Sequence, residues 1–205
     1  MLTLYHAPYT RSSSIIQLLI ELNALDRVDV RVVDVARQDG RGTADPANLH
    51  PEGKVPLLVH DGVMIRERGA IIQYLTELFP SELAPKPGDP TRGAYLGWLA
   101  YYGAVIEPVM ITTLLGLDHP GLHANFRGKA EMSDALINAL SDQPYLLGDR
   151  FTAVDLLVSS PFDWMPSFAP TDQVVQDWLA RCTDRPAYRA MGSYDAGLMP
   201  AAKAG

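Results

Sequence analysis

The stretch HPEGKVPLLVHDGVMIRERGAIIQYL, residues 50–75, carries the signals that decide the fold of the N-terminal part of the chain. Two short apolar runs, 55–60 and 63–66, predict strands, and the Asp-Gly pair between them is a strong signal for a tight hairpin. We therefore expect these two strands to be antiparallel. The apolar residues that follow have helical spacing and predict a helix beginning near Arg68; they are Ala70, Ile71, Tyr74, Leu75 and Leu78.

Upstream of this stretch, strand and helix signals alternate. The run LTLY (2–5) predicts a strand, residues 13–25 have the pattern of a helix, and VDVRVVDV (28–35) predicts a second strand. A β-α-β order joins its two strands in parallel through a right-handed crossover. Residues 1–79 are therefore expected to form an α/β domain.

A change of composition follows near residue 80. The segment FPSELAPKPGDP, residues 79–90, contains four prolines and a glycine, and this composition is typical of a linker between domains, which we assign to residues 80–90. Strand signals then vanish. Residues 91–205 are expected to form an all-helical domain, with amphipathic helices up to about residue 192 and breaks at DHPG, DQPY and SPFDWMP.

Composition excludes several classes of protein. The chain has 205 residues, 47% hydrophobic and 20% charged, as is usual for a globular protein, and its net charge of −7 argues against a nucleic-acid partner. The N-terminus lacks a signal peptide pattern, and nowhere do eighteen consecutive apolar residues occur, so we expect a cytoplasmic protein without a membrane partner. The single cysteine, Cys182, allows no intrachain disulfide and no thiolate metal cluster, and its simplest role is that of a buried small hydrophobe.

Two further motifs accompany the predicted helix start at Arg68. Val55-Pro56 stands at the start of a strand, where proline is simply tolerated. A sharper interpretation is a cis bond that turns the Val55 backbone outward to pair with an extended peptide ligand. In LLGDRFTAVDLLVSS, residues 146–160, Thr152 and Asp155 have capping-box spacing before an apolar run, which predicts the start of a helix.

Together, in this order and at these separations, the three motifs resemble those of the glutathione transferase family, and the likeness covers nearly the whole chain. The resemblance implies an α/β thioredoxin-like N-terminal domain followed by an all-α C-terminal domain. It also implies glutathione as a co-substrate without a metal, and a two-fold homodimer. The first strand, which runs LYHAP at residues 4–8, resembles that of bacterial members, in a serine-type, theta-like branch.

The resemblance also implies a set of glutathione-binding residues. The residue before the strand proline, Val55, would pair through its backbone with the cysteinyl part of glutathione beside Pro56. Lys54 would reach the glycyl carboxylate. In the family, a Glu-Ser or Gln-Ser dipeptide at the helix start binds the γ-glutamyl carboxylate, and here the dipeptide is Glu67-Arg68.

Arg68 departs from that pattern and leaves three interpretations open. Its guanidinium can grip the γ-glutamyl carboxylate bidentately at a helix N-terminus that already favours anions. It can instead mark a site in which glutathione binding has decayed. The third interpretation is an arginine that points into solvent and leaves only its backbone N–H in place.

Activation of a thiol requires a hydrogen-bond donor, because the thiolate is the nucleophile and a free thiol titrates near pH 8.5. In serine-type relatives this hydroxyl lies two residues after the proline of the first loop, a position occupied here by Thr10. The positions of the tyrosine and cysteine types hold His6 and Arg11, and neither matches its class. Ser12 and Ser13 are alternatives to Thr10, although their simplest role is to cap the following helix.

The first helix of the second domain is rich in aromatic residues, and the resemblance implies that such a helix lines an electrophile pocket between the domains. Tyr101 and Tyr102 are the candidates there, and Tyr9 of the first loop is a candidate for bordering the ligand. An apolar site of this kind suits a small hydrophobic electrophile.

The sequence therefore favours a glutathione transferase that joins the glutathione thiolate to a hydrophobic electrophile. Two alternatives remain open. A non-catalytic binding or dimerisation module would explain the lost serine at position 68. A glutathione-dependent disulfide reductase is the second alternative, although no cysteine follows the first strand.

Overall fold

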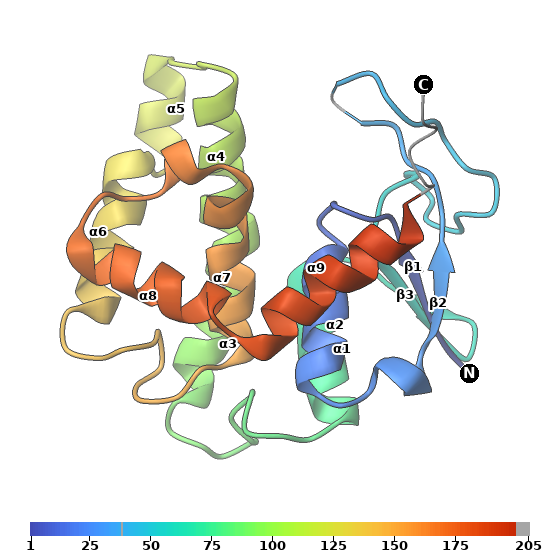
Figure 1. The fold of residues 1–205 in the computed structure, drawn as a ribbon. Coiled ribbons are helices and arrows are strands. Elements are labelled where there is room, and N and C mark those ends of the chain that lie inside the picture. Colours follow the sequence, from blue (N-terminus) through green and yellow to red (C-terminus); the bar gives the residue numbers. More distant parts are fainter. Residues whose placement is uncertain (38, 200–205) are drawn as a thin grey trace. The chain divides into compact units, whose positions relative to one another are not determined.

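The computed structural model describes residues 1–37 and 39–199. The chain divides by packing into two compact units (Figure 1). One unit contains Met1–Phe79 together with the chain from Pro186 onward, and the other contains Pro80–Arg185. The expected α/β region followed by a helical region is confirmed, and each unit is described by itself below.

A four-stranded mixed sheet forms the centre of the first unit. Its strands have the order β2-β1-β3-β4, and β1 pairs in parallel with β2 and antiparallel with β3. The hairpin predicted around the Asp-Gly pair is confirmed, because β3 and β4 are antiparallel and joined by that turn. The strands are β1 (Leu2–His6), β2 (Asp29–Val32), β3 (Leu57–His60) and β4 (Val63–Ile65).

Three helices belong to the same unit. They are α1 (Ser13–Glu21), α2 (Arg68–Leu78) and α9 (Pro186–Leu198), with a short 3₁₀ turn at Leu25–Arg27. Helices α1 and α2 pack together, and α9 runs along α1 (Figure 1). Helix α1 ends earlier than predicted because Asn23 has a φ of 50°, a left-handed conformation that stops the helical hydrogen-bond ladder.

Strand β2 is also shorter than the predicted run 28–35. Its end is fixed by Asp34, whose carboxylate accepts from the N–H groups of Val35 (2.8 Å) and Thr43 (2.8 Å). These bonds fold the following loop back on itself, so that after Val33 the backbone no longer pairs with β1. The hydrogen bonds to Asp34 lower the pKa of this exposed carboxyl group.

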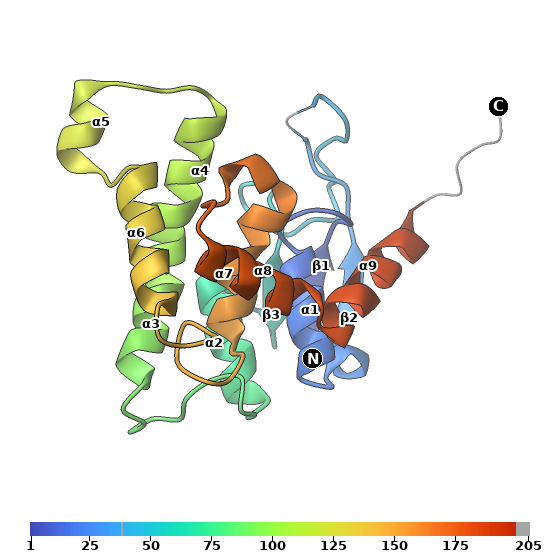
Figure 2. The ribbon, with the colours of Figure 1, turned by 60° about the vertical axis from the view of Figure 1, so that its left-hand side comes forward.

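The second unit is helical, as expected, apart from one isolated bridge between Tyr145 and Gly148. Its helices are α3 (Arg92–Tyr101), α4 (Glu107–Leu114), α5 (Pro120–Asn125), α6 (Lys129–Leu140), α7 (Ala153–Trp164) and α8 (Gln173–Thr183), with a π-helical segment at Tyr102–Ile106 and a 3₁₀ turn at Pro166–Phe168. Figure 2 shows α4 and α6 side by side. By length and composition alone, the continuous run Arg92–Leu114 could cross a membrane, as can core helices of soluble proteins.

The capping motif of α7 is a buried hydrogen-bond centre. The Asp155 carboxylate accepts from Thr152 N–H (2.9 Å) and from the Thr152 hydroxyl (2.8 Å), which confirms the predicted helix start. It also accepts from Leu146 N–H (2.9 Å) and from Trp178 Nε1–H (2.9 Å). One fully buried side chain therefore joins the preceding loop and α8 to the start of α7.

Helix α9 differs from the sequence-based division of the chain. Residues 91–205 were expected to form one helical domain, but α9 packs on α1 of the first unit. The physical reason is a set of polar contacts made by Asp195, which is fully buried against the loop between β1 and α1.

We predict that Asp155→Ala lowers the free energy of unfolding by about 2–5 kcal/mol, because three buried N–H donors, those of Leu146, Thr152 and Trp178, lose their acceptor. Asp172→Ala is the matched control. Asp172 is an exposed cap of α8 that accepts only from Val174 N–H, and its loss should cost about 1 kcal/mol. Urea denaturation of both variants tests this, and equal losses would show that the Asp155 network adds nothing beyond a cap.

Candidate functional site

Three of the predicted segments meet at one edge of the sheet. Strand β3 runs antiparallel to β1 and β4, with Tyr5 opposite Leu57 and Leu58 opposite Ile65. The end of β1, the start of β3 and the end of β4 therefore lie at the same edge. This register brings together the loop after β1, the Val55-Pro56 segment before β3, and the start of α2.

The loop after β1 holds a pair of hydroxyl groups in contact. The Oγ1 atom of Thr10 lies 2.8 Å from the Oγ of Ser12 and 2.7 Å from the carbonyl oxygen of Ala7. Ser12 N–H also donates to Thr10 Oγ1 over 3.2 Å. Thr10 is half-buried whereas Ser12 is fully buried, so Thr10 is the member of the pair that a bound molecule can reach.

The expected capping role of Ser12 is wrong. Ser12 occupies the N-cap position of α1, but its side chain makes no capping hydrogen bond. Its Oγ instead turns toward β1, where it accepts from Ala7 N–H (3.1 Å) and lies 2.7 Å from His6 Nδ1. The backbone at residue 12 is helical rather than extended, and this directs the side chain away from the helix N–H groups.

Asp195 of α9 closes this cluster from the other side. Its Oδ2 accepts from the Ser13 hydroxyl (2.5 Å) and from Tyr9 N–H (2.8 Å). Its Oδ1 lies 3.1 Å from His6 Nε2, and both side chains are fully buried. Burial raises the pKa of Asp195, but the contact with His6 and the hydrogen bonds from Ser13 and Tyr9 outweigh burial and hold the pKa below its ordinary value.

The contact between His6 and Asp195 is close but bent. The separation of 3.1 Å is within hydrogen-bond reach, yet neither His6 Nε2 nor Asp195 Oδ1 makes a well-aligned hydrogen bond to any described residue. The two atoms are therefore neighbours, and neither has another hydrogen-bond partner in residues 1–37 and 39–199.

Tyr9 forms the exposed tip of the loop. Its backbone has a φ of 56°, which is uncommon for a bulky residue, and the hydrogen bond from its N–H to Asp195 holds it there. The ring is 54% exposed. The position is compatible with the prediction that Tyr9 borders a ligand, which stays a prediction.

The Val55-Pro56 peptide bond is cis, as the sharper of the two sequence interpretations requires, and the pairing of the Val55 backbone with a peptide ligand stays a prediction. Pro56 is buried, Val55 is half-buried, and Lys54 is exposed. The side chain of Asn48 donates to the Lys54 carbonyl oxygen over 3.1 Å and so fixes the backbone before the strand. This segment can present its backbone and one cation to an extended, anionic ligand.

The start of α2 has an unusual backbone. Glu67 is the N-cap with a φ of 66°, a left-handed conformation that costs a non-glycine residue about 1–3 kcal/mol and that often occurs at functional sites. Arg68 is the first helical residue and is only 8% exposed. The interpretation in which Arg68 points into solvent is therefore wrong, because little of the residue is open to bulk solvent.

The aromatic candidates of the second domain lie in the second unit. Tyr102 is 2% exposed, so the structure gives it a packing role rather than an open surface. Tyr101 is half-buried, its ring contacts Trp98 edge-on at 5.3 Å, and the Arg127 guanidinium lies 5.8 Å from its centroid. Burial raises the pKa of Tyr101.

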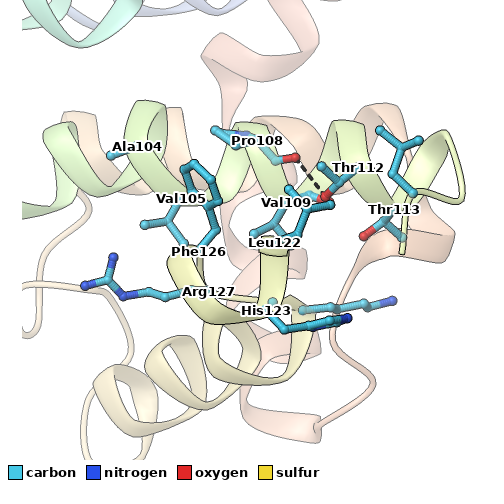
Figure 3. A pocket seen from close by; sticks show the side chains of 13 residues that line it. Ala104, Val105, Pro108, Val109, Thr112, Thr113, Leu122, His123, Phe126 and Arg127 are labelled. Atoms are coloured by element: carbon cyan, nitrogen blue, oxygen red, sulfur yellow. Dashed lines mark hydrogen bonds between the residues drawn. The ribbon is translucent and has the colours of Figure 1, made fainter. Parts of the chain in front are cut away.

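A cavity that the sequence did not indicate lies in the second unit, between α4 and the segment around α5 (Figure 3). Its volume is about 280 Å³, and none of its lining residues is a predicted site residue. The walls include Val105, Val109, Leu122 and Phe126, with Arg127 at the rim. An apolar hollow beside a cation can hold a hydrophobic molecule that carries a negative charge.

Cys182 is buried, as expected, and burial is the main reason that its thiol pKa is raised. It lies on α8, in the second unit, and is inert as a nucleophile in this state. Within the part of the chain that the structure describes, no three His, Cys, Asp or Glu side chains are grouped to hold a metal ion.

Comparison with known proteins adds a second line of argument. A family model for the glutathione S-transferase N-terminal domain matches residues 4–86, and one for the glutathione S-transferase C-terminal domain matches residues 116–186. Glutathione S-transferase 3 of Schizosaccharomyces pombe is 27% identical over 92% of this chain and 86% of its own length.

Solved structures share the fold over nearly the whole chain. A glutathione S-transferase from Actinobacillus pleuropneumoniae aligns with a TM-score of 0.78 at 21% identity, over 96% of this chain and 93% of its own. A sphingomonad glutathione S-transferase complexed with glutathione aligns with a TM-score of 0.72 at 24% identity, over 96% and 100%.

The two family models together span more than half of the sequence, in the order in which the two units begin along the chain. The α/β unit with its mixed sheet and the helical unit that follows it are those of this fold. The chain therefore belongs to the glutathione S-transferase family.

Proposed function

We propose that the protein is a glutathione-dependent transferase in which the glutathione thiolate attacks a small hydrophobic electrophile. The observation that carries this proposal is the meeting of a hydroxyl pair, the half-buried segment before β3 and a helix N-terminus at one edge of the sheet. These elements can respectively contact the thiol, the peptide backbone and a carboxylate of glutathione.

Thr10 is the hydroxyl that we propose to contact the thiol sulfur. It is half-buried and in contact with the buried Ser12. The Thr10 hydroxyl is therefore the outer one of two neighbouring hydroxyls, and the Ser12 hydroxyl is the inner one. A donor at this point stabilises the thiolate relative to the thiol. This assignment corresponds to a serine-type, theta-like branch with threonine at the hydroxyl position.

Glutathione would be held by contacts at its two ends and in its middle. The backbone of Val55, next to Pro56, is proposed to pair with the cysteinyl part, and Lys54 to reach the glycyl carboxylate. Arg68 is proposed to grip the γ-glutamyl carboxylate beside Glu67. An arginine suits this role because its planar fork matches a carboxylate.

A non-catalytic binding or dimerisation module is the second candidate, and the arginine in place of serine at position 68 favours it. Retention on immobilised glutathione, followed by an assay with a hydrophobic aryl halide, separates the two. The transferase requires both binding and turnover. The disulfide reductase has less support, because the single thiol, Cys182, is buried in the other unit.

We further propose that the protein acts in the cytoplasm as a homodimer. The chain mass is 22.4 kDa, so light scattering at micromolar concentration should give about twice that mass. A monomer under those conditions would contradict the proposed assembly.

We predict that Thr10→Val lowers kcat/KM roughly tenfold to hundredfold, since a hydrogen bond to a charged group is worth about 1.5–3 kcal/mol. Thr10→Ser should keep most of the activity. Ser14→Ala is the control, because the Ser14 hydroxyl donates to the Arg11 carbonyl oxygen (2.8 Å) rather than to Thr10 or Ser12, and its loss should leave kcat/KM unchanged. Full activity in Thr10→Val would assign the thiol contact to another group.

We predict that Arg68→Ala weakens glutathione binding by about 1.5–3 kcal/mol, as expected for loss of a charged hydrogen bond, and that Arg68→Ser restores much of it. Arg66→Ala is the control, since Arg66 is exposed and pairs with Glu52 at 3.2 Å. Calorimetric titration measures all three variants. Tighter binding in Arg68→Ala or Arg68→Ser than in the parent protein would mean that the arginine blocks a decayed site.

A further inference from the structure

A buried ionisable pair lies directly behind the proposed catalytic hydroxyl. His6 and Asp195 are both fully buried, come from opposite ends of the chain, and contact each other at 3.1 Å. From His6, hydrogen-bond distances lead outward through Ser12 (2.7 Å) to Thr10 (2.8 Å). Hydroxyl stabilisation of a thiolate requires only Thr10, so the pair behind it has no role in the function proposed above.

The contacts of the imidazole fix where its proton lies. Asp195 is ionised at neutral pH, because its hydrogen bonds hold its pKa low, and a carboxylate can only accept. In the neutral imidazole, the Nε2 atom that faces this carboxylate carries the proton, and Nδ1 is left as an acceptor. The Ala7 carbonyl oxygen lies within donor reach of both hydroxyls, at 3.1 Å from Ser12 Oγ and 2.7 Å from Thr10 Oγ1. By rotating away from that carbonyl, the Ser12 hydroxyl can donate to His6 Nδ1 and the Thr10 hydroxyl to Ser12 Oγ.

Other titratable groups near the imidazole do not alter this assignment. Tyr194 of α9 faces His6 with its ring centroid at 6.2 Å. Burial, and then the charge of Asp195, raise the pKa of Tyr194, so the phenol stays neutral. Asp195 is therefore the charged group that sets the protonation of His6 from α9.

Resting on the proposed transferase function, we infer that the thiol proton of glutathione passes through the hydroxyls of Thr10 and Ser12 to Nδ1 of His6. The S–H bond breaks and its proton binds Thr10 Oγ1. The Thr10 proton moves to Ser12 Oγ, and the Ser12 proton moves to His6 Nδ1. The products are a thiolate and an imidazolium, and the total charge is unchanged.

After the transfer, the Thr10 hydroxyl still donates a hydrogen bond to the thiolate sulfur. After the three steps, each hydroxyl points outward, and the proton on Thr10 Oγ1 faces the sulfur. The imidazolium then lies beside the Asp195 carboxylate, and a carboxylate at this distance favours the charged ring. His6 thus acts through the hydroxyls as a positioning and proton-accepting residue.

An acyl-transfer role for the same residues does not fit. An aspartate, a histidine and a serine whose side chains contact one another in that order are the residue types of a hydrolase triad. Ser12 is fully buried here, however, and the route outward from its Oγ passes through Thr10. A carbonyl substrate cannot reach Ser12 Oγ, whereas a proton can pass through Thr10.

The first experiment uses the unmodified protein and measures how many protons are released into solution for each thiolate formed. Glutathione is added in weakly buffered solution near neutral pH while ultraviolet absorbance reports thiolate and an indicator dye reports released protons. S-methylglutathione, which has no thiol, corrects for proton changes that binding itself causes. The relay predicts thiolate formation with much less than one proton released per thiolate.

Each other outcome has a distinct meaning. One proton released for each thiolate formed would overturn the relay and leave the transferase intact. Absence of glutathione binding would overturn the proposed function, and the relay with it. Binding without thiolate would also contradict the relay, because its product is the thiolate.

The variant Asp195→Asn provides a second, independent test of the relay. The amide keeps an acceptor for Ser13 and Tyr9 but turns an N–H toward His6 Nε2, which places the imidazole proton on Nδ1 and blocks acceptance. We expect kcat/KM to fall roughly hundredfold, within the range for a positioned base, with less than a threefold change in glutathione affinity. Ser14→Ala is the control, since the Ser14 hydroxyl donates to the Arg11 carbonyl oxygen, outside the relay, and its loss should leave both the kinetics and the proton count unchanged. Equal kinetics in Asp195→Asn and the parent protein would overturn the relay.

Discussion

The carboxylate of Asp195 is the interaction on which the proposed site depends. It lies on the last helix and is buried against the first loop of the chain, where it accepts from Ser13 and from the Tyr9 backbone. A buried charge is tolerated only where several donors surround it, so α9 can dock on α1 only with this loop in its observed conformation. The same carboxylate faces His6 Nε2 at 3.1 Å, and in the proposed relay it orients the hydroxyls of Ser12 and Thr10 through that ring.

The unusual backbone positions also gather at this edge of the sheet. Tyr9 and Glu67 both have positive φ, and each stands beside a residue that we propose to contact glutathione, Thr10 in one case and Arg68 in the other. Such conformations persist only where the surrounding fold enforces them. The rigid sheet, with β3 paired on both sides, supplies that enforcement and keeps the proposed thiol and carboxylate contacts at fixed positions.

Local signals explain which features the sequence could predict. The Asp61-Gly62 hairpin and the Thr152 cap of α7 depend on neighbouring residues, and both are confirmed. The end of β2 depends on Asp34 bonding to Thr43, and the docking of α9 depends on Asp195 meeting residues at the opposite end of the chain. No local pattern marks these long-range contacts. For the same reason the sequence marks His6 only as an exception to the tyrosine position and gives no sign that Arg68 is buried.

The most direct test of this account is the protonation state of the His6 ring, measured by nitrogen NMR on the protein with and without glutathione. The account predicts a neutral ring with its proton on Nε2 in the free protein, because Asp195 faces that atom. It predicts protons on both ring nitrogens once the thiolate has formed. A ring that stays neutral while thiolate absorbance appears would contradict the account.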